Sequence, residues 1–450
     1  MFYKLNFASK EVPVAQETFS DRLRQAMSDR DVRQSDVIRA SEMLGKKLGK
    51  SQMSQYVSGK TIPRRDVAEL LARILEVDVT WLLASDADQG ETSSPRNVSK
   101  PEPNPSAQIA RSATMRTFSK SSKLDNVLYD VRGPVVDEAA RMEDEGERIL
   151  KLNIGNPAPF GFRTPDEVIK DMRQQLPDCE GYSNSRGLFS ARKAIMQYSQ
   201  IKGLPNVQME HIYTGNGVSE LIQLSMNALL DNGDEIIIPE PFYPNYNTFI
   251  ATTGASIRPI PTRPEEGYFY ASREKLEAAI NERTRAIMVT NPGNPTGTVL
   301  THAQMEMILD VAKKHGLFLI ADEVYREFVY SGEPLSSFGQ LPGAEENLIL
   351  IDSVSKRFSS CGARIGCLIS RNKEFLAQAL KYCQARLSVA TLDQIASAAL
   401  YSVGPDYFEA VREEYCRRRD TVVAGLKKIP GVVCECPQGA FYLMAALPVD

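Results

Sequence analysis

The chain has 450 residues, 42% of them hydrophobic, and its 53 basic and 57 acidic residues give a formal net charge of −4. This size predicts two or three domains with at least one large core. The balanced charge argues against a protein that coats nucleic acid and against one that binds membrane surfaces. Seven cysteines without a CxxC pair and only three histidines argue against a disulfide framework and against a His/Cys metal site.

Composition divides the chain into four parts. Residues 1–16 form a leader without the apolar region of a signal peptide, and no run of about 18 apolar residues occurs, so we expect a cytoplasmic protein without a membrane span. Residues 86–122 are rich in Pro, Ser and charge, which is the composition of a flexible linker. This linker separates a small domain, residues 17–85, from a large domain, residues 123–450.

The small domain is expected to contain short helices and to end in the leucine-rich run "DVAELLARILEVDVTWLL". In its middle lies "GKSQMSQYVSGKTIPRR", and from Met43 to Arg65 there are six Lys or Arg residues and no acid. From Glu17 to Ser85 as a whole, 12 basic residues stand against 10 acidic ones. The positive charge is therefore local, as a DNA-binding surface requires.

This stretch resembles the lambda-repressor-like (Xre-type) helix-turn-helix family, in which a polar recognition helix is followed by "SGK", a proline and a leucine-rich helix ending in "WLL". The segment "ASEMLGKKLGK" makes the connection between the two reading helices several residues longer than is usual there. The resemblance implies base contacts by Ser51, Gln52 and Gln55, and phosphate contacts by Lys50, Ser58 and Lys60. The alternative is a helical bundle used for dimerisation, with a solvated basic loop.

The large domain alternates short aliphatic runs with helical patterns. The runs are "DEIIIPEP", "RAIMVTNPGNP", "GLFLIADEVY" and "NLILIDSVSK", and residues 301–315 carry apolar residues at helical spacing. This alternation predicts a mostly parallel α/β sheet in three layers, with short loops at the strand ends where open sheets bind their ligands.

Polar side chains follow these runs at the strand ends: Tyr243, Asn294, Asp322, Tyr325 and Lys356. Each alone has an ordinary explanation, because turns favour asparagine, aspartates cap helices and most lysines extend into solvent. Together they match the needs of pyridoxal phosphate. This cofactor requires an amine that forms an imine, an acid for the pyridinium nitrogen, a phenol and an amide for the ring hydroxyl, and an aromatic ring for stacking.

Two further segments suit the phosphate of that cofactor. The stretch "YTGNGVSEL" holds a glycine turn that opens a helix, where free backbone N–H groups favour an anion, and the turn comprises Gly215, Asn216, Gly217, Val218 and Ser219. Arg364, eight residues after Lys356, supplies a guanidinium, and Ser353 adds a hydroxyl.

From Lys120 to its last residue the chain resembles the fold-type I, class I/II aminotransferases. The segments "KLNIGNPAPFGF", "GYSNSRGLFSARKAI" and "YTGNGVSELI" are most similar to the bacterial glutamate–pyruvate (alanine) aminotransferases. The resemblance implies exchange of an amino group between an L-amino acid, expected to be alanine, and a 2-oxo acid. It also implies that Lys356 forms a Schiff base with pyridoxal phosphate and that Asp322 pairs with the pyridine nitrogen.

The same resemblance assigns the remaining contacts. Tyr325 and Asn294 would hydrogen-bond the ring oxygen, Tyr243 would stack on the ring, and Gly155 would lie against the substrate carboxylate. The phosphate would be held by Ser353, Arg364, the turn at 215–219, and Tyr182 reaching over from the second subunit of a homodimer.

Two other functions stay open: a transcriptional regulator that senses pyridoxal phosphate or an amino acid, and a pyridoxal-phosphate-dependent carbon–sulfur lyase. The run "GAFYLMAALPV", residues 439–449, is expected to be a core strand of a small domain. In the family an arginine beyond this segment binds the substrate carboxylate. Because the sequence stops at Asp450, we expect either a truncated product or a small domain that lacks this arginine.

Overall fold

The computed structural model describes residues 18–30, 32–44, 48–75, 77, 79–83, 120–127, 134–332 and 335–448. The chain divides into two compact units, Met1–Thr117 and Phe118–Asp450. The expected leader, residues 1–16, and almost all of the expected linker, residues 86–122, lie outside the described residues. Within the described residues, no helix combines the length and the apolar character needed to cross a membrane.

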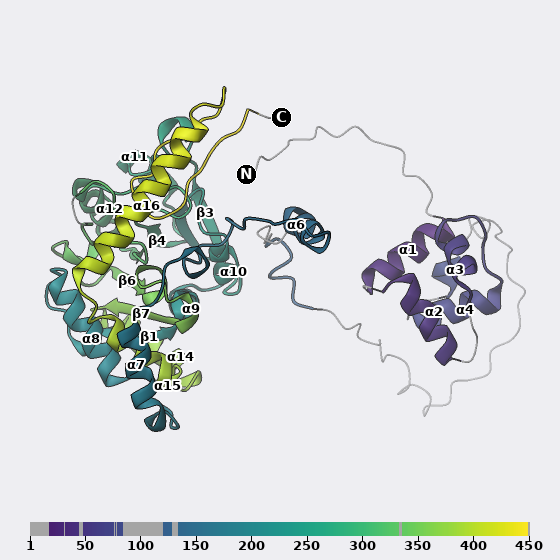
Figure 1. Cartoon of the computed structure of the whole chain (residues 1–450), viewed down its shortest axis with the longest axis horizontal. Helices are drawn as coiled ribbons and strands as arrows, with labels where there is room; N and C mark the ends of the chain where they lie inside the picture. Colours follow the sequence, from purple (N-terminus) through teal and green to yellow (C-terminus); the bar gives the residue numbers. More distant parts are fainter. Residues whose placement is uncertain are drawn as a thin grey trace, which may run out of the picture. The chain divides into compact units, whose positions relative to one another are not determined.

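The first unit is helical in its described part (Figure 1). Thr18 caps its first helix, because the threonine hydroxyl and the Asp21 carboxylate each accept a backbone N–H in a capping box. Leu23, Met53 and Leu71, from three different helices, are fully buried in a shared core. The helices are α1 (Phe19–Asp29), α2 (Gln34–Met43), α3 (Lys50–Val57), α4 (Arg65–Ile74) and α5 (Val79–Leu83).

The second unit is built on a seven-stranded sheet of order β1-β7-β6-β5-β4-β2-β3. Neighbouring strands from β6 to β3 run parallel, and β7 runs antiparallel to both β1 and β6. The predicted mostly parallel sheet is therefore confirmed. The strands are β1 (Ile212–Asn216), β2 (Glu235–Pro239), β3 (Ser256–Ile260), β4 (Thr284–Thr290), β5 (Phe318–Asp322), β6 (Leu348–Ser353) and β7 (Ile365–Ser370).

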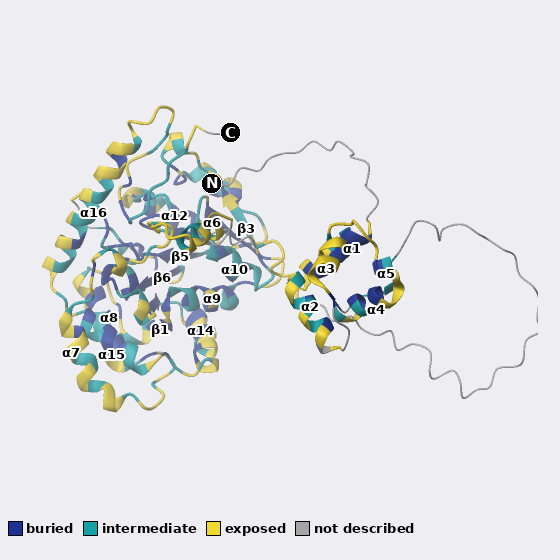
Figure 2. Ribbon diagram, turned by 45° about the vertical axis from the view of Figure 1, so that its right-hand side comes forward, coloured by how far each residue is buried: buried dark blue, intermediate teal, exposed yellow. Residues whose placement is uncertain are grey.

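Both faces of the sheet are buried at its central strands β2, β4, β5 and β6, which explains why these strands are largely aliphatic (Figure 2). Ile237 belongs to the core on one face, which also includes residues of α8 (Phe189–Ile201), α11 (Arg273–Ala279) and α12 (His302–Lys314). Its neighbours Ile236 and Ile238 belong to the opposite core, with α9 (Gly217–Leu229), α10 (Asn245–Ala251) and α14 (Lys373–Ala385). This gives the predicted three layers.

The register of the sheet brings several strand ends to one edge. Thr290, the last residue of β4, pairs with Asp322, the last residue of β5, and Asp322 pairs in turn with Ile351 of β6. Parallel strands therefore end side by side at the positions where the sequence predicted polar site residues. The other helices of this unit are α6 (Pro134–Asp144), α7 (Asp166–Gln175), α13 (Val354–Arg357), α15 (Thr391–Leu400) and α16 (Pro405–Leu426).

The prediction of a core strand at residues 439–449 is wrong. The described part of this segment makes isolated bridges, Val329 with Gly439 and Val433 with Ala446, in place of a continuous ladder. Ala440 has a φ of 57°, a left-handed conformation that interrupts an extended strand. The residues that follow, Phe441 and Tyr442, pack on aromatic side chains.

Candidate active site

Lys356 lies on α13, a single turn of helix that directly follows β6. Its Nζ donates a hydrogen bond of 2.6 Å to the carbonyl oxygen of Gly155 and lies 3.8 Å from Sγ of Cys361. The Cys361 thiol donates to the carbonyl oxygen of Ser355 at 3.1 Å. The half-buried lysine is thus directed at the loop around Gly155.

Asp322 ends β5 and is 4% exposed. Its Oδ2 accepts a hydrogen bond of 2.8 Å from the hydroxyl of Tyr246, and that hydroxyl lies 2.9 Å from Oγ1 of Thr290. Burial raises the pKa of Asp322 to about 6, against the lowering effect of the Tyr246 hydrogen bond. A cation placed at this carboxylate would relieve the cost of burying its charge.

Tyr325 lies in the loop after β5, and its hydroxyl is 2.8 Å from the hydroxyl of Tyr442. Nδ2 of Asn294 donates to the same Tyr325 oxygen at 3.5 Å. Burial, and next the neighbouring Tyr442, raise the pKa of Tyr325 well above its usual value, so this phenol stays protonated at neutral pH. The phenol and amide predicted to act on one ring oxygen are therefore side by side.

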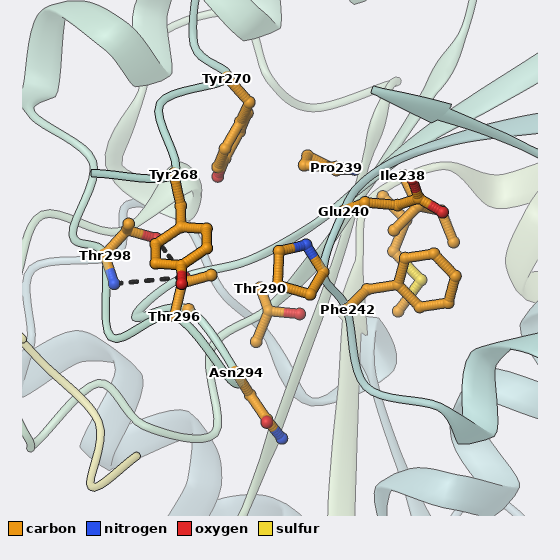
Figure 3. Close-up of a pocket in the computed structure, with 13 residues that line it drawn as sticks. Ile238, Pro239, Glu240, Phe242, Tyr268, Tyr270, Thr290, Asn294, Thr296 and Thr298 are labelled. Atoms are coloured by element: carbon orange, nitrogen blue, oxygen red, sulfur yellow. Dashed lines mark hydrogen bonds between the residues drawn. The ribbon is translucent and has the colours of Figure 1, made fainter. Parts of the chain in front are cut away.

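A cavity of about 30 Å³ borders this region and is lined in part by Asn294 and Thr290. Figure 3 shows Thr296 and Thr298 on one side of the cavity and Phe242 on the other. It has room for about one or two water molecules, far less than the roughly 300 Å³ of a ligand pocket. The cavity borders the candidate site but is too small to hold a cofactor.

Tyr243 lies just before α10 and is half-buried. Its hydroxyl accepts a hydrogen bond of 2.7 Å from Nδ2 of Asn245, and its ring meets the Tyr246 ring edge-on at 5.5 Å. Burial raises the pKa of Tyr442 to about 12 against the lowering effect of its hydrogen bond with Tyr325, and the neighbouring Tyr243 phenol raises it too. The stacking residue predicted from the sequence therefore borders the same site.

The residues predicted to hold the phosphate meet where β1 joins α9. Gly217 is the first residue of α9, with a φ of 74°, and a Cβ atom there would overlap Nη2 of Arg364. The guanidinium of Arg364 thus lies directly against a helix N-terminus, whose first N–H groups have no partner within the helix. Ser353 caps α13, and its Oγ accepts the N–H of Ser355 at 3.0 Å.

The other residues of the glycine turn take up supporting positions. Gly215 pairs with Gly366 of β7, and the backbone N–H of Asn216 donates to the Glu220 carboxylate at 2.7 Å. Val218 and Ser219 are half-buried in the first turn of α9.

Gly155 is required by its surroundings, because a Cβ atom there would overlap the Tyr442 hydroxyl and lie 2.9 Å from the Phe441 ring. The Tyr442 hydroxyl lies within hydrogen-bond distance of the Tyr325 hydroxyl and packs closely against Gly155. The carbonyl oxygen of Gly155 accepts the hydrogen bond from Lys356, so these four residues belong to one site. Tyr182 stands apart, since it is 84% exposed and has no place in this set of contacts.

These groups fit pyridoxal phosphate. The donor set offers an amine at Lys356, a buried carboxylate at Asp322, a phenol beside an amide, and a guanidinium at a helix N-terminus where only a glycine fits. Each of these matches one chemical group of the cofactor: aldehyde, pyridine nitrogen, ring hydroxyl and phosphate. The residues that would hold it are Lys356, Asp322, Tyr325, Asn294, Tyr243, Ser353, Arg364 and residues 215–219.

Three further residues belong to this site and were not predicted from the sequence. Tyr246 hydrogen-bonds Asp322, Tyr442 bonds Tyr325, and Cys361 lies beside Lys356. A signal existed for Tyr246, which follows Tyr243 at a helical spacing of three residues. For Tyr442 the sequence gives no such signal, because the apolar run that contains it predicts a strand.

In the first unit, the residues predicted to contact DNA cluster around α3. Lys50, Ser51, Gln52 and Gln55 lie on α3 and are exposed, as are Ser58 and Lys60 in the turn after it. The same helix buries Met53 and Tyr56 in the core. Nε2 of Gln52 donates to the Tyr56 hydroxyl at 2.9 Å, which fixes the direction of the glutamine amide.

Comparison with known proteins agrees with the geometry of the large unit. Residues 147–450 match the family model described as aminotransferase class I and II. The glutamate-pyruvate aminotransferase AlaA of Haemophilus influenzae is 35% identical over 350 residues, covering 74% of this chain and 84% of that protein. The alanine aminotransferase of Mycobacterium tuberculosis is 37% identical over 341 residues, covering 74% and 79% respectively.

Solved structures give the same result. A crystal structure of an aminotransferase from Escherichia coli matches with a TM-score of 0.69 and 37% identity, covering 73% of this chain and 83% of that one. An alanine aminotransferase from Pyrococcus furiosus matches with a TM-score of 0.69 and 30% identity, covering 74% and 85%. The family predicted from the sequence is therefore confirmed: the chain belongs to the class I and II aminotransferases and is a pyridoxal-phosphate-dependent transaminase.

Proposed function

We propose that this transaminase exchanges the amino group of alanine with 2-oxoglutarate, and that of glutamate with pyruvate. Relatives named as glutamate-pyruvate and alanine aminotransferases support this substrate pair. The observation that carries the proposal is the site itself, in which Lys356, the buried Asp322 and the paired Tyr325 and Asn294 offer the groups that pyridoxal phosphate needs for transamination.

The residues of the site divide the catalytic tasks. When bound, pyridoxal phosphate supplies an electron-accepting ring that stabilises the carbanion left by removal of the substrate α-proton. Lys356 would act as the base and acid that moves this proton, because its Nζ is the flexible amine at the site. Asp322 would keep the pyridine nitrogen protonated, while Tyr325 and Asn294 would orient the ring hydroxyl. Arg364 and the N-terminus of α9 would hold the phosphate.

A steady-state assay tests the substrate proposal. Purified protein supplied with pyridoxal phosphate should form pyruvate from alanine only when 2-oxoglutarate is present. A carbon–sulfur lyase would instead release ammonia and pyruvate from cystathionine without an oxo-acid acceptor. If alanine is inert while another amino acid reacts with the same acceptor, the alanine proposal fails and the transaminase assignment stands.

We also propose a homodimer in which Tyr182 completes the phosphate site of the partner subunit. Its 84% exposure leaves the phenol available for a partner, and Phe189, 64% exposed, is a large apolar residue nearby in the sequence. Sedimentation should give a dimer. Tyr182→Phe should weaken the retention of pyridoxal phosphate while the protein remains a dimer. A monomer with full cofactor occupancy would contradict this proposal.

For the first unit we propose sequence-specific DNA binding through α3. The supporting observation is that exposed polar and basic side chains share one helix, while Met53 and Tyr56 anchor the other side of that helix in the core. Gel-shift measurements on the full chain, with and without pyridoxal phosphate, test this. A regulator without catalysis would show cofactor-dependent DNA binding and no pyruvate from alanine.

A further inference from the structure

A set of buried charges lies next to the candidate active site. Two segments each carry two site residues: Asp322–Arg326 at the end of β5, and Asp352–Arg357 across the end of β6 and α13. Each of these site residues has a charged sequence neighbour that is at most 7% exposed. The pairs are Asp322 with Glu323, Tyr325 with Arg326, Ser353 with Asp352, and Lys356 with Arg357.

The four charged neighbours form one continuous chain of ion pairs. Arg357 pairs with Asp352, whose Oδ2 is 3.7 Å from Nη1 of Arg326, and Nη2 of Arg326 is 2.7 Å from Oε2 of Glu323. Two guanidinium groups and two carboxylates make this chain electrically neutral. It joins the segment Asp322–Arg326 to the segment Asp352–Arg357.

Both ends of this ion-pair chain are fixed to the surrounding core. Oε1 of Glu323 accepts hydrogen bonds from the Ser337 hydroxyl at 3.0 Å and from the Phe338 N–H at 2.9 Å. At the other end, the guanidinium of Arg357 lies 4.5 Å from the centre of the Tyr198 ring. The middle is fixed too, because Oδ1 of Asp352 accepts the N–H of Ser353 at 2.7 Å.

This arrangement is poorly explained as a device for stability alone. Nε and Nη1 of the fully buried Arg357 find no hydrogen-bond partner in the described part of the chain, and unpaired buried donors are unfavourable. Buried ion pairs can often be replaced by apolar residues without loss of stability. What the ion-pair chain does provide is a fixed distance between the segments Asp322–Arg326 and Asp352–Arg357.

Lys356 depends on such a constraint because its helix is short. α13 comprises Val354–Arg357, and a single helical turn has little stability of its own. Consecutive residues on a helix point about 100° apart, so Lys356 can face the site only while Arg357 faces the core. Holding the Arg357 side chain therefore sets the direction of the lysine.

We propose that Arg357, acting through Asp352, Arg326 and Glu323, is a positioning residue that fixes Lys356 relative to Asp322 and Tyr325. The inference rests on the proposed role of Lys356 as the residue that links the cofactor. Arg357 touches neither substrate nor cofactor in this proposal; it acts through the backbone of α13.

The test uses two variants of the full chain. Arg357→Met/Asp352→Leu removes one neutral pair and leaves the Arg326–Glu323 pair intact. Arg357→Lys keeps the charge but loses the planar guanidinium that lies against Tyr198. Cofactor-free protein is mixed with pyridoxal phosphate, and the rate at which Lys356 becomes linked is followed by visible absorbance and checked by borohydride trapping and peptide mass. Thermal unfolding reports folding, and Arg273→Met, at an exposed pair on α11, is the matched control.

We expect the double variant to fold and to link pyridoxal phosphate about 10–100-fold more slowly, with kcat lowered and the KM for alanine little changed. Arg357→Lys should be slowed about 3–10-fold, and the control not at all. A folded variant of either kind that links the cofactor at the wild-type rate overturns the proposal. If neither variant folds, the ion-pair chain acts on stability and not on position, and the proposal is wrong. If wild-type protein is not linked at Lys356, it is instead the assigned role of this lysine that fails.

Discussion

The amine of Lys356 and the carbonyl of Gly155, 201 residues apart in the sequence, are joined by a hydrogen bond of 2.6 Å. This contact connects α13 with the loop at residues 152–157, so the lysine lies against distant backbone instead of extending into solvent. A structural lysine at a strand end would have no need of such a partner.

Lys356→Ala should therefore abolish the linkage to pyridoxal phosphate and lower transamination by about a thousandfold or more, since proton transfer by a positioned base contributes 10²–10⁴-fold. Borohydride reduction followed by peptide mass spectrometry measures the linkage, and pyruvate formation measures turnover. Lys373→Ala, on the exposed start of α14, is the control and should behave as the wild type. Normal turnover in Lys356→Ala would refute the assignment.

Asp322 should make the cofactor-free protein less stable as the pH rises. Burial raises the pKa of Asp322 to about 6 in the folded state, against roughly 3.9 in an unfolded chain. The folded state therefore binds the proton more tightly, and the resulting stabilisation is complete below about pH 4 and is lost as the pH rises through 6. At pH 8 the folded protein carries a buried carboxylate charge that its hydrogen bonds from Tyr246 and the Val324 N–H offset only in part.

Asp322→Asn should consequently stabilise the cofactor-free protein by about 1–3 kcal/mol at pH 8 and by much less at pH 5, while removing transamination. The amide oxygen can still accept the Tyr246 hydroxyl, so the packing is kept. Urea unfolding at the two pH values measures the difference, with the exposed Asp137→Asn as control. If Asp322→Asn is less stable than the wild type at both pH values, burying the Asp322 charge does not destabilise the folded protein.

The strand-end residues of the site were predictable because the sheet follows simple rules. A continuous aliphatic run marks a strand buried on both faces, and polar residues after Val289, Ala321 and Ile351 then fall at one edge of a parallel sheet. Local pattern was enough to find Asn294 and Asp322, since their positions depend only on where a strand ends.

Contacts between distant segments were not predictable in this way. Tyr442 reaches Tyr325 because Ala440 turns the chain with a φ of 57°, and an apolar run gives no sign of such a turn. The antiparallel direction of β7 depends on its pairing with β1 and β6, which local sequence does not encode. Arg357 follows a loop lysine and has no sequence feature that distinguishes it from a solvated arginine, although it is fully buried.

Gly155→Ala should damage the site through steric overlap. The new Cβ atom would overlap the Tyr442 hydroxyl and approach the Phe441 ring to 2.9 Å, so either the loop or Tyr442 must move. Because a displacement of about 1 Å at a reacting group can cost 10²-fold, we expect kcat/KM to fall by about 10–100-fold.

A second substitution and a control make this test specific. Tyr442→Phe removes the atom closest to the new methyl group, so it should restore part of the activity of Gly155→Ala. Gly425→Ala lies in α16 with open space around it and should stabilise the protein by about 0.5–1 kcal/mol without affecting turnover. Unchanged kcat/KM in Gly155→Ala would mean that the loop at Gly155 does not shape the site.

DNA binding by the first unit should separate into a salt-dependent part and a sequence-dependent part. Lys50 and Lys60 are exposed at the two ends of the α3 region, so replacing either with alanine should weaken binding to all sequences and reduce the salt slope by about 1. Gln52→Ala should instead reduce the difference in binding free energy between the preferred base and other bases at one position by about 1–3 kcal/mol. Tyr56→Phe should do the same more weakly, because the Tyr56 hydroxyl holds the Gln52 amide at 2.9 Å.

Fluorescence anisotropy across a salt series measures both effects, with the exposed Lys381→Ala on α14 as control. If binding is independent of salt, or if Lys50→Ala and Lys381→Ala bind alike, the first unit does not contact DNA through α3.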